Sequence, residues 1–470
     1  GTNYISNWLG ATITTTNGHG MQIVRDGSGV TNVTNAGTIN ASRRGMFVDT
    51  STSTGDTNIT NSGSITSVES AINVDASADT GNLSITHSGT SNVTGSFHAV
   101  DITAFTSMRG AVNIGNSAGA NDVITINDGS AIRIDAINGA SDIDIDTATG
   151  AKLTVGGGVS SGIQVLMTDT GANTSGFDIR HDGSLTATGA SKGIEVGVDE
   201  AQAGTNNTYG TVTIGSTGSL QTDTGTAISV SVQDGGNGAT SARIDTTIEA
   251  GGSVTSTGGV GFEEQTSANS IDLQTTLDIA GTLSGGTAAT RMGSGDDTTI
   301  LRNTASVTGQ IDGGTGTDTL QFDFSSAKTQ DASQFTNFET LTKSSSGQLS
   351  FTGTNADTMS VLLQQGSIAF NGTMTNSTVT ASAGTTVRGW ATFACLTPMG
   401  PTVAPGNSIG TLTVQGNVTF GDNSTYAVEV DQNGNADRIN ATGAATIYSN
   451  LNTFKESDPA VVYQGTSTSY

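Results

Sequence analysis

The residues of this chain with the clearest potential for chemistry lie in glycine- and aspartate-rich turns past its middle. The segment 313–322, GGTGTDTLQF, matches the G-G-x-G-x-D-x-L pattern of calcium-binding β-helical repeats, with Asp318 at its acidic position. A shorter partner, GSGDD at 293–297, places Asp297 about one repeat upstream. Because Ca²⁺ is held by carboxylate and carbonyl oxygens, stacked turns of this kind make Asp297 and Asp318 candidate calcium ligands. Calcium sites of this type repeat the motif many times, so an acidic turn without metal is the alternative.

A second group of carboxylates occupies the run DIDID at 142–146. Strand alternation places Asp142, Asp144 and Asp146 on one face and the two isoleucines on the other. Clustered carboxylates can bind a metal or act on a sugar. No histidine or cation lies beside them in the sequence, so we interpret this run as a solvated, edge-protecting acidic face.

Two short motifs resemble fragments of enzyme signatures. The GHG at 18–20 occurs in β-helical polygalacturonases, but the aspartate motifs and the R-I-K that accompany it there are misplaced or missing. The DGSG at 26–29 lacks the residue order of a serine-protease signature, and no chymotrypsin-like segment precedes it to supply His and Asp. The sequence therefore predicts no catalytic residue and no organic cofactor. We expect His19 to be a corner residue and Cys395 to be a thiol without a function.

The elements that must position these residues are short strands in a degenerate repeat. One half of the unit reads N-x-G-[ST]-[IL], as at 35–39 and 61–65, and the other reads G-[IMV]-x-V, as at 45–48 and 162–165. A single unit cannot bury its apolar edge, so successive units must stack Ile, Val and Leu into a continuous column. This predicts an all-β, right-handed parallel β-helix (a β-solenoid), an elongated rod with about 25 residues per coil. We also expect the Asn or His before each corner glycine to stack as a ladder.

The composition excludes several classes of partner. Sixteen Lys and Arg oppose 41 Asp and Glu, the net charge is −25, and no basic run is longer than Arg43–Arg44. A nucleic-acid surface needs clustered cations, so we expect no nucleic-acid partner. No apolar run approaches the roughly 20 residues of a spanning helix, which argues against direct membrane insertion of this segment. A single cysteine excludes an intrachain disulfide framework, so stability must come from repetition.

The segment 402–445 carries the most specific resemblance. An APGNSIGTL turn at 404–412 precedes a paired strand, and an acidic strand is followed by D-R-I at 437–439. This wording resembles the passenger-associated repeat of bacterial autotransporters. The resemblance implies type V secretion, display on the surface of a Gram-negative bacterium with a tether to the outer membrane, and folding that begins at this repeat. The family's C-terminal outer-membrane barrel is not recognisable, so we expect the chain to be a fragment of such a protein.

Four regions follow from these patterns. We expect a degenerate-repeat β-helix over 1–290 and a continuing β-helix with Gly/Asp turns over 291–401. The passenger-associated repeat then occupies 402–447, and a divergent tail follows at 448–470. Within the second region, the stretch 390–401 departs from the sequence pattern of the family.

The autotransporter family includes adhesins, proteases and esterases. Because the sequence lacks a catalytic constellation, we expect a non-enzymatic adhesin or structural rod. Its outward Thr, Asn and Asp rows would bind host-cell or extracellular-matrix proteins or glycans. The alternatives are a self-associating surface protein, a β-helical carbohydrate-active enzyme, and a filament exported by a two-partner system.

Overall fold

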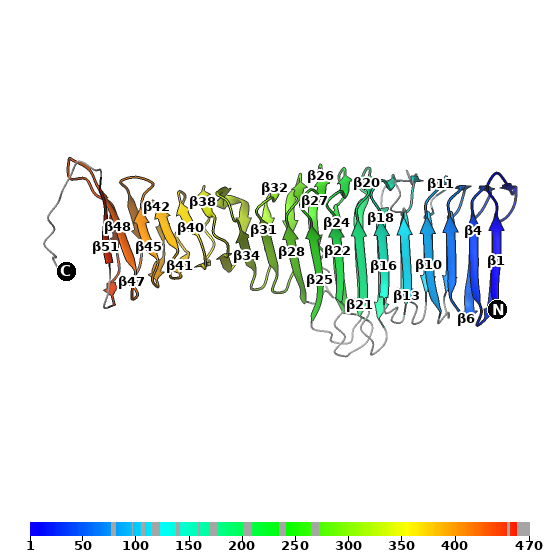
Figure 1. Ribbon diagram of the computed structural model, residues 1–470, viewed down its shortest axis with the longest axis horizontal. Coiled ribbons are helices and arrows are strands. Elements are labelled where there is room, and N and C mark those ends of the chain that lie inside the picture. Colours follow the sequence, from blue (N-terminus) through cyan, green and yellow to red (C-terminus); the bar gives the residue numbers. More distant parts are fainter. Residues whose placement is uncertain are drawn as a thin grey trace. The chain divides into compact units, whose positions relative to one another are not determined.

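The computed structural model describes residues 1–470 except 77–80, 96, 105–108, 115–122, 138–141, 158–159, 170–175, 201–208, 235–240, 266–271, 449–451 and 458–470. The protein is all-β, and its strands pair in parallel with counterparts one coil along the chain, as the repeat predicts (Figure 1). The chain divides into two compact units, which are described separately. The first comprises Gly1–Thr298 and Thr304–Gly316, and the second comprises Thr299–Asn303 and Thr317–Tyr470.

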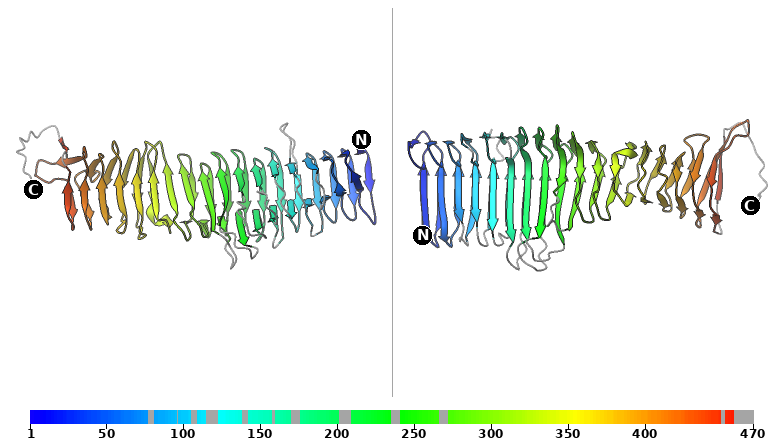
Figure 2. Two further views of the ribbon diagram at one scale, coloured as in Figure 1. Left: turned by 90° about the horizontal axis from the view of Figure 1, so that it is seen from below. Right: turned by 180° about the vertical axis from the view of Figure 1, so that it is seen from behind.

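The first unit is a β-helix in which successive coils supply successive strands of three parallel sheets (Figure 1, Figure 2). The first sheet contains β1 (Thr2–Asn7), β4 (Val30–Asn35), β7 (Thr57–Asn61), β10 (Asn82–His87), β13 (Arg109–Ile114), β16 (Asp142–Thr147), β19 (Gly176–His181), β22 (Tyr209–Ile214), β25 (Ser241–Ile248) and β28 (Asp272–Ile279). The second contains β2 (Thr12–Thr14), β5 (Thr38–Ala41), β8 (Ser64–Ser67), β11 (Thr90–Val93), β14 (Val123–Ile126), β17 (Lys152–Val155), β20 (Ser184–Ala187), β23 (Ser219–Thr222), β26 (Ser253–Ser256), β29 (Thr282–Gly285) and β32 (Ser306–Thr308). The third contains β3 (Met21–Gly27), β6 (Met46–Ser53), β9 (Ile72–Ala76), β12 (Val100–Ala104), β15 (Ile132–Ile137), β18 (Ser161–Asp169), β21 (Lys192–Glu200), β24 (Ile228–Asp234), β27 (Val260–Glu264), β30 (Ala288–Arg291) and β33 (Ile311–Asp312).

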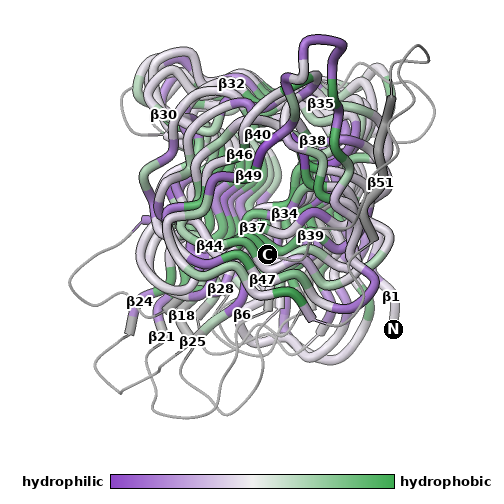
Figure 3. The backbone as a smooth tube through the Cα atoms, turned by 90° about the vertical axis from the view of Figure 1, so that its left-hand side faces the viewer, coloured by the Kyte–Doolittle hydropathy of each residue, from purple (hydrophilic) through white to green (hydrophobic). Residues whose placement is uncertain are grey.

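Period-2 alternation decides which side chains enter the core. In β7, Ile59 is buried, whereas Asn58 and Thr60 reach the surface. The register places Ile59 between Val33 and Ile85 of the adjacent coils, so like residues form a column. Each such side chain contributes about 1.5–3 kcal/mol by burial. The hydropathy colouring shows hydrophobic residues of successive strands stacked behind one another (Figure 3).

The predicted corner ladder is confirmed in the first coils. Asn7 donates from Nδ2 to Asn35 Oδ1 at 2.8 Å, and Asn35 donates to Asn61 Oδ1 at 2.7 Å. His87 occupies the next position of the column, and its Nε2 lies 2.7 Å from Ser91 Oγ. All of these side chains are buried. The sequence therefore places a hydrogen-bonded polar column beside the apolar columns.

This ladder yields a first prediction. Replacing Asn35 by Ala removes both amide bonds and leaves a cavity, so the free energy of unfolding should fall by about 2–4 kcal/mol. Asn32 lies on the outward face of the same strand and accepts from Asn58 Nδ2 at 3.0 Å. Asn32→Ala should therefore cost less than about 1 kcal/mol. Urea unfolding followed by circular dichroism measures both variants, and equal losses would contradict the inward ladder.

Coils in the middle of the second unit are short, whereas its last coils span 27 residues, as from Leu412 to Ile439 (439 − 412). Leu341 pairs with Val361, 20 residues on (361 − 341), whereas Asn35 bonds to a side chain 26 residues on. One run of strands contains β31 (Thr298–Arg302, apart from its first residue), β34 (Thr319–Asp323), β37 (Thr340–Lys343), β39 (Ser360–Leu363), β41 (Thr378–Ala381), β44 (Cys395–Pro398), β47 (Val418–Phe420) and β50 (Ala445–Ile447). Another contains β35 (Lys328–Asp331), β38 (Gln348–Thr352), β40 (Ser367–Phe370), β42 (Thr386–Gly389), β45 (Thr402–Pro405), β48 (Thr425–Val430) and β51 (Asn452–Ser457). The remaining strands are β36 (Phe335–Thr336), which follows a 3₁₀ turn at Ala332–Gln334, and β43 (Thr392–Phe393), β46 (Thr411–Val414) and β49 (Arg438–Ala441).

The core of the second unit is aromatic. Buried rings pack edge-on or stacked along it, and Phe370 and Phe393 lie closest at 4.6 Å between centroids. The stretch 390–401 forms β43 and β44, with Phe393 and Leu396 fully buried. This stretch therefore continues the coil despite its unusual sequence. The tail 448–470 lies mostly outside the described residues. No helix in the described part of the chain is long and apolar enough to cross a membrane.

Candidate binding surface and motif-bearing turns

The two predicted calcium ligands lie in buried turns of different units. Asp297, in the first unit, is 1 % exposed, and its Oδ1 accepts the backbone N–H of Thr275 at 2.7 Å. Asp318, in the second unit, is fully buried, and its own N–H donates to Glu339 Oε2 at 2.7 Å. Both positions thus take part in carboxylate–backbone bonds between neighbouring coils. In the described residues, no three His, Cys, Asp or Glu side chains gather as a metal site requires. Calcium at Asp297 and Asp318 stays a prediction.

Among the described residues, one serine hydroxyl lies at hydrogen-bonding distance from a histidine ring, that of Ser91 beside His87. Their 2.7 Å contact has the geometry of an activated serine. Both residues are buried in the coil, and His87 Nδ1 has no hydrogen-bond partner in the described structure. Burial lowers the pKa of His87 to about 4. A neutral imidazole enclosed by core residues stabilises the corner and is not reached by a substrate.

The acidic run at 142–146 has the predicted arrangement where its side chains are described. Asp144 and Asp146 are exposed, and Ile143 and Ile145 are buried; the Asp142 side chain lies outside the described residues. Partial burial raises the pKa of Asp146, and the nearby carboxylate of Asp178 adds to this rise. The run is a solvated strand face, as interpreted from the sequence.

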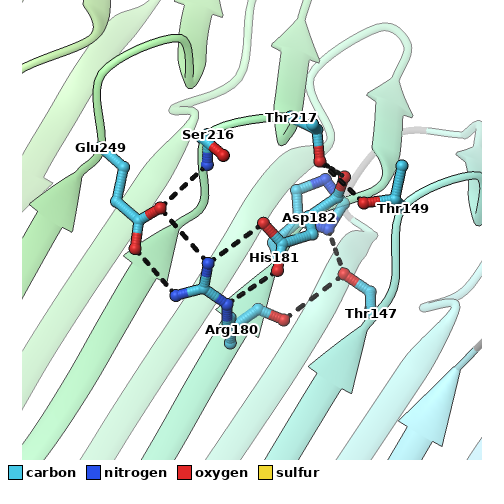
Figure 4. A network of polar contacts seen from close by, with 8 residues as sticks. All are labelled: Thr147, Thr149, Arg180, His181, Asp182, Ser216, Thr217 and Glu249. Carbon is cyan, nitrogen blue, oxygen red and sulfur yellow. Dashed lines mark hydrogen bonds and ion pairs between the residues drawn. The ribbon is translucent and has the colours of Figure 1, made fainter. Parts of the chain in front are cut away.

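A polar network joins several coils at the end of this face (Figure 4). Arg180 Nε lies 2.7 Å from Asp182 Oδ2, and Arg180 Nη1 lies 2.9 Å from Glu249 Oε1. Glu249 also accepts the backbone N–H of Ser216 at 3.0 Å. The hydrogen bond to Glu249, followed by that to Asp182, raises the pKa of Arg180, and the Arg180 bond lowers the pKa of Glu249. The guanidinium therefore bridges two coils at the surface that are separated by the coil of Ser216.

His181 follows Arg180 in the same strand but points to the opposite side (Figure 4). It is fully buried, its Nδ1 contacts Thr147 Oγ1, and its Nε2 lies 3.2 Å from Ser219 O. Burial lowers the pKa of His181 to about 4. His181 thus belongs to the inward column that also holds His87. The remaining residues of the drawing, Thr149 and Thr217, bond to each other at 2.9 Å.

The first sheet carries a regular outward surface. Its register aligns two sets of side chains that we call the outward rows: Asn32, Asn58 and Ser84 in one, and Thr34, Thr60 and Thr86 in the other. Successive side chains of a row lie about 4.8 Å apart, the spacing of neighbouring strands. Farther along, the first row's register passes Ala111, which adds no polar group, and then leads to Asp144, Asp178, Thr211 and Asp245. A flat array of hydroxyl, amide and carboxylate groups can form many small hydrogen bonds with an extended partner.

His19 lies at a corner before β3, as expected, with its ring 5.2 Å from that of Phe47. Arg44 stacks over the same Phe47 ring at 4.6 Å. Cys395 is a free thiol at the start of β44. Cys395 Sγ lies 3.9 Å from Thr397 Oγ1, and Arg44 forms an ion pair with Glu69 at 3.4 Å.

Asp437 has a role that the sequence did not reveal. It is 7 % exposed and accepts two backbone N–H groups, from Gly410 at 2.8 Å and from Glu429 at 2.9 Å. Tyr426 donates its hydroxyl to the Asp437 carbonyl at 3.2 Å. One carboxylate therefore joins the APGNSIGTL turn to the acidic strand. We call Asp437 with these bonds the Asp437 clasp.

Comparisons with known proteins give one similarity. Over 104 residues, 22 % of the chain, the sequence is 35 % identical to a Serratia marcescens protein described as an extracellular serine protease. The matched part spans 10 % of that protein's length. No protein-family model and no solved structure matches the chain. Similarity to a secreted protein, together with the β-helical fold, fits an autotransporter-type passenger and indicates an extracellular location.

Proposed function

We propose that the chain is a non-enzymatic passenger displayed at the outer surface of a Gram-negative bacterium, where it serves as an adhesin or structural surface element. The observation that carries this proposal is the continuity of the outward rows over successive coils. The resemblance of 402–445 to the passenger-associated repeat and the extracellular relative support the route of export.

The physical basis is additive recognition. Each hydroxyl or amide of a row contributes a weak hydrogen bond, and strand spacing repeats that contact along the face. A longer protein strand or glycan can therefore bind more tightly, because it makes more of these contacts along the face. The net charge of −25 keeps the surface soluble and disfavours acidic polymers.

The protease activity named for the Serratia protein is not part of this proposal. The matched part covers a tenth of that protein. In the described residues of this chain, the one serine hydroxyl at hydrogen-bonding distance from a histidine ring, in the pair His87–Ser91, is enclosed in the core. A protease needs that pair at a surface with a third residue that orients the histidine.

The test is binding of the labelled chain to host cells, fibronectin and collagen, with and without a calcium chelator. Saturable binding to one partner, with no cleavage of casein, is the expected result. Loss of binding with chelator would assign calcium a role and direct attention to Asp297 and Asp318. Clumping of coated beads without any partner would replace adhesion by self-association, and casein hydrolysis would refute the non-enzymatic proposal.

A further inference from the structure

Three side chains lie at one corner of the second unit, where adjacent strands of one sheet end (Figure 1). Asn371 directly follows β40, Trp390 directly follows β42, and Asn407 comes two residues after β45. The register joins β40 to β42 and β42 to β45, so the coil of Trp390 lies between the coils of the two asparagines. We call these three residues the Trp390 corner.

Trp390 is an outward aromatic residue beside an inward aromatic core. Its neighbours Gly389 and Ala391 are buried, so alternation directs the indole to the surface, where 53 % of Trp390 is exposed. Phe370 and Phe393, which lie before and after it in the chain, are fully buried. The indole therefore adds nothing to the packing that these rings provide, and its flat apolar surface is available to a ligand.

The two asparagines bond to each other across the coil of Trp390. Asn407 Nδ2 donates to Asn371 Oδ1 at 3.0 Å, although 36 residues separate the two positions. This bond uses one polar atom of each amide, and Asn371 Nδ2 and Asn407 Oδ1 form no hydrogen bond with the described residues. The pair thus holds one donor and one acceptor at a fixed separation. Side chains that are already held in place lose less entropy when a ligand binds.

The corner is neutral in an acidic protein. Both neighbours of Trp390 on the adjacent coils are amides, although 41 Asp and Glu oppose 16 Lys and Arg in the chain. Arg388 lies two residues before Trp390 on the same outward face, and its partners in register are Ala369 and Ala404. The net charge of −25 disfavours an anionic ligand, whereas amides suit an uncharged one.

We propose that the Trp390 corner binds a neutral hexopyranose unit of a glycan, with the C–H face of the sugar ring against the indole and two adjacent hydroxyls at Asn371 and Asn407. The C–H face is the apolar side of a sugar and matches a flat aromatic surface. Neighbouring ring hydroxyls donate and accept hydrogen bonds, as the amide pair requires. The site belongs to the second unit, so it is separate from the outward rows of the first unit and stands whether or not those rows bind a partner.

Titration of the full chain carrying Trp8→Phe with lactose, cellobiose and maltose tests the proposal. Trp390 is then the remaining tryptophan, so its fluorescence reports contact with the sugar directly. At least one of the three disaccharides should change this fluorescence saturably, with a Kd on the order of 1 mM, as expected of one small polar site. Sorbitol, which has the hydroxyls of a sugar but no ring face, should cause no saturable change.

Variants assign the contact, with saturation-transfer NMR as the measurement where the fluorophore is removed. Trp390→Ala should reduce affinity at least tenfold, and Asn371→Ala and Asn407→Ala should each reduce it about threefold to tenfold. Trp8→Ala is the matched control, because Trp8 is a 76 % exposed tryptophan of the first unit, and it should change affinity less than twofold. Arg388→Gln should also change affinity less than twofold, because the ligand is neutral.

Circular dichroism establishes that each variant is folded, and the two asparagine variants keep the test decisive if Trp390→Ala unfolds. A chain with Lys at Thr34, Thr60 and Thr86 of the outward rows should bind the disaccharide like the wild type, which separates this site from the proposed adhesive rows. The proposal would be overturned by no saturable change with any of the three disaccharides, by an equal response to sorbitol, or by unchanged affinity in the folded Trp390→Ala variant. Equal losses in Trp8→Ala and Trp390→Ala would also overturn it, since any exposed indole would then suffice.

Discussion

Asp437→Ala should lower the free energy of unfolding of the second unit by about 3–5 kcal/mol, because two backbone N–H groups lose a charged acceptor inside the protein. The carboxylate holds Gly410 and Glu429 at 2.8 and 2.9 Å, and both bonds disappear together. No other side chain at this place substitutes for them in the described structure. Urea unfolding monitored by Trp390 fluorescence, in a Trp8→Phe background, reports on the second unit alone, because Trp8 and Trp390 are the two tryptophans of the chain.

The neighbouring Arg438 supplies the control. It is exposed at the start of β49, so Arg438→Gln should change the same free energy by less than about 0.5 kcal/mol. Asp437→Asn keeps the shape of the side chain but places an NH₂ group near one backbone donor. Its free energy of unfolding should lie between those of Asp437→Ala and Arg438→Gln. If Asp437→Ala unfolds at the same urea concentration as Arg438→Gln, the Asp437 clasp does not hold the 402–445 segment.

Mild acid should destabilise the first unit by way of its buried histidines. The folded pKa of His87 and of His181 is about 4, and the unfolded value is 6.5. Between these values the unfolded chain binds protons that the folded chain does not, so stability falls as pH falls through this window. From pH 7 to pH 5 the loss is about 2 kcal/mol per histidine, or about 4 kcal/mol for both. Urea midpoints measured at pH 7, 6 and 5 reveal the effect.

A matched variant assigns the loss to the histidines. The column that holds His87 is asparagine in the three preceding coils, at Asn7, Asn35 and Asn61. His87→Asn therefore continues an existing ladder and should keep most of the stability at pH 7. His87→Asn should also remove about half of the decrease in the free energy of unfolding between pH 7 and pH 5. An unchanged pH profile in the His87→Asn, His181→Asn double variant would show that carboxylates, and not these histidines, cause the acid sensitivity.

The architecture was accessible from sequence because it depends on local alternation and repetition. Ile59 and Asn58 lie on opposite faces because successive side chains of a strand alternate, and this alternation recurs in every unit. The units stack because each must cover its apolar edge. The corner ladder was accessible too, since a buried amide is stable only when a neighbouring coil supplies its partner. Coil length was less predictable, because the coils in the middle of the second unit close with fewer residues around a phenylalanine core.

The sites were much harder to predict, because they depend on which residues meet between coils. In the sequence, Asn371 and Asn407 are separate turn residues, and their bond across the coil of Trp390 requires the register of β40, β42 and β45. Asp437 was noticed only as part of a motif, and its two backbone partners lie 27 and 8 residues away.

The most direct test of the proposed function compares two rows of the same unit in binding to the cell or matrix partner of the wild-type chain. The test variant carries Lys at Thr34, Thr60 and Thr86 of the outward rows. The control carries Lys at Asn40, Thr66 and Asn92, an aligned surface row on the second sheet with the same added charge. We predict at least a tenfold loss of affinity for the first variant and less than a twofold change for the second, with both folded by circular dichroism. Equal binding by both variants would contradict recognition through the outward rows.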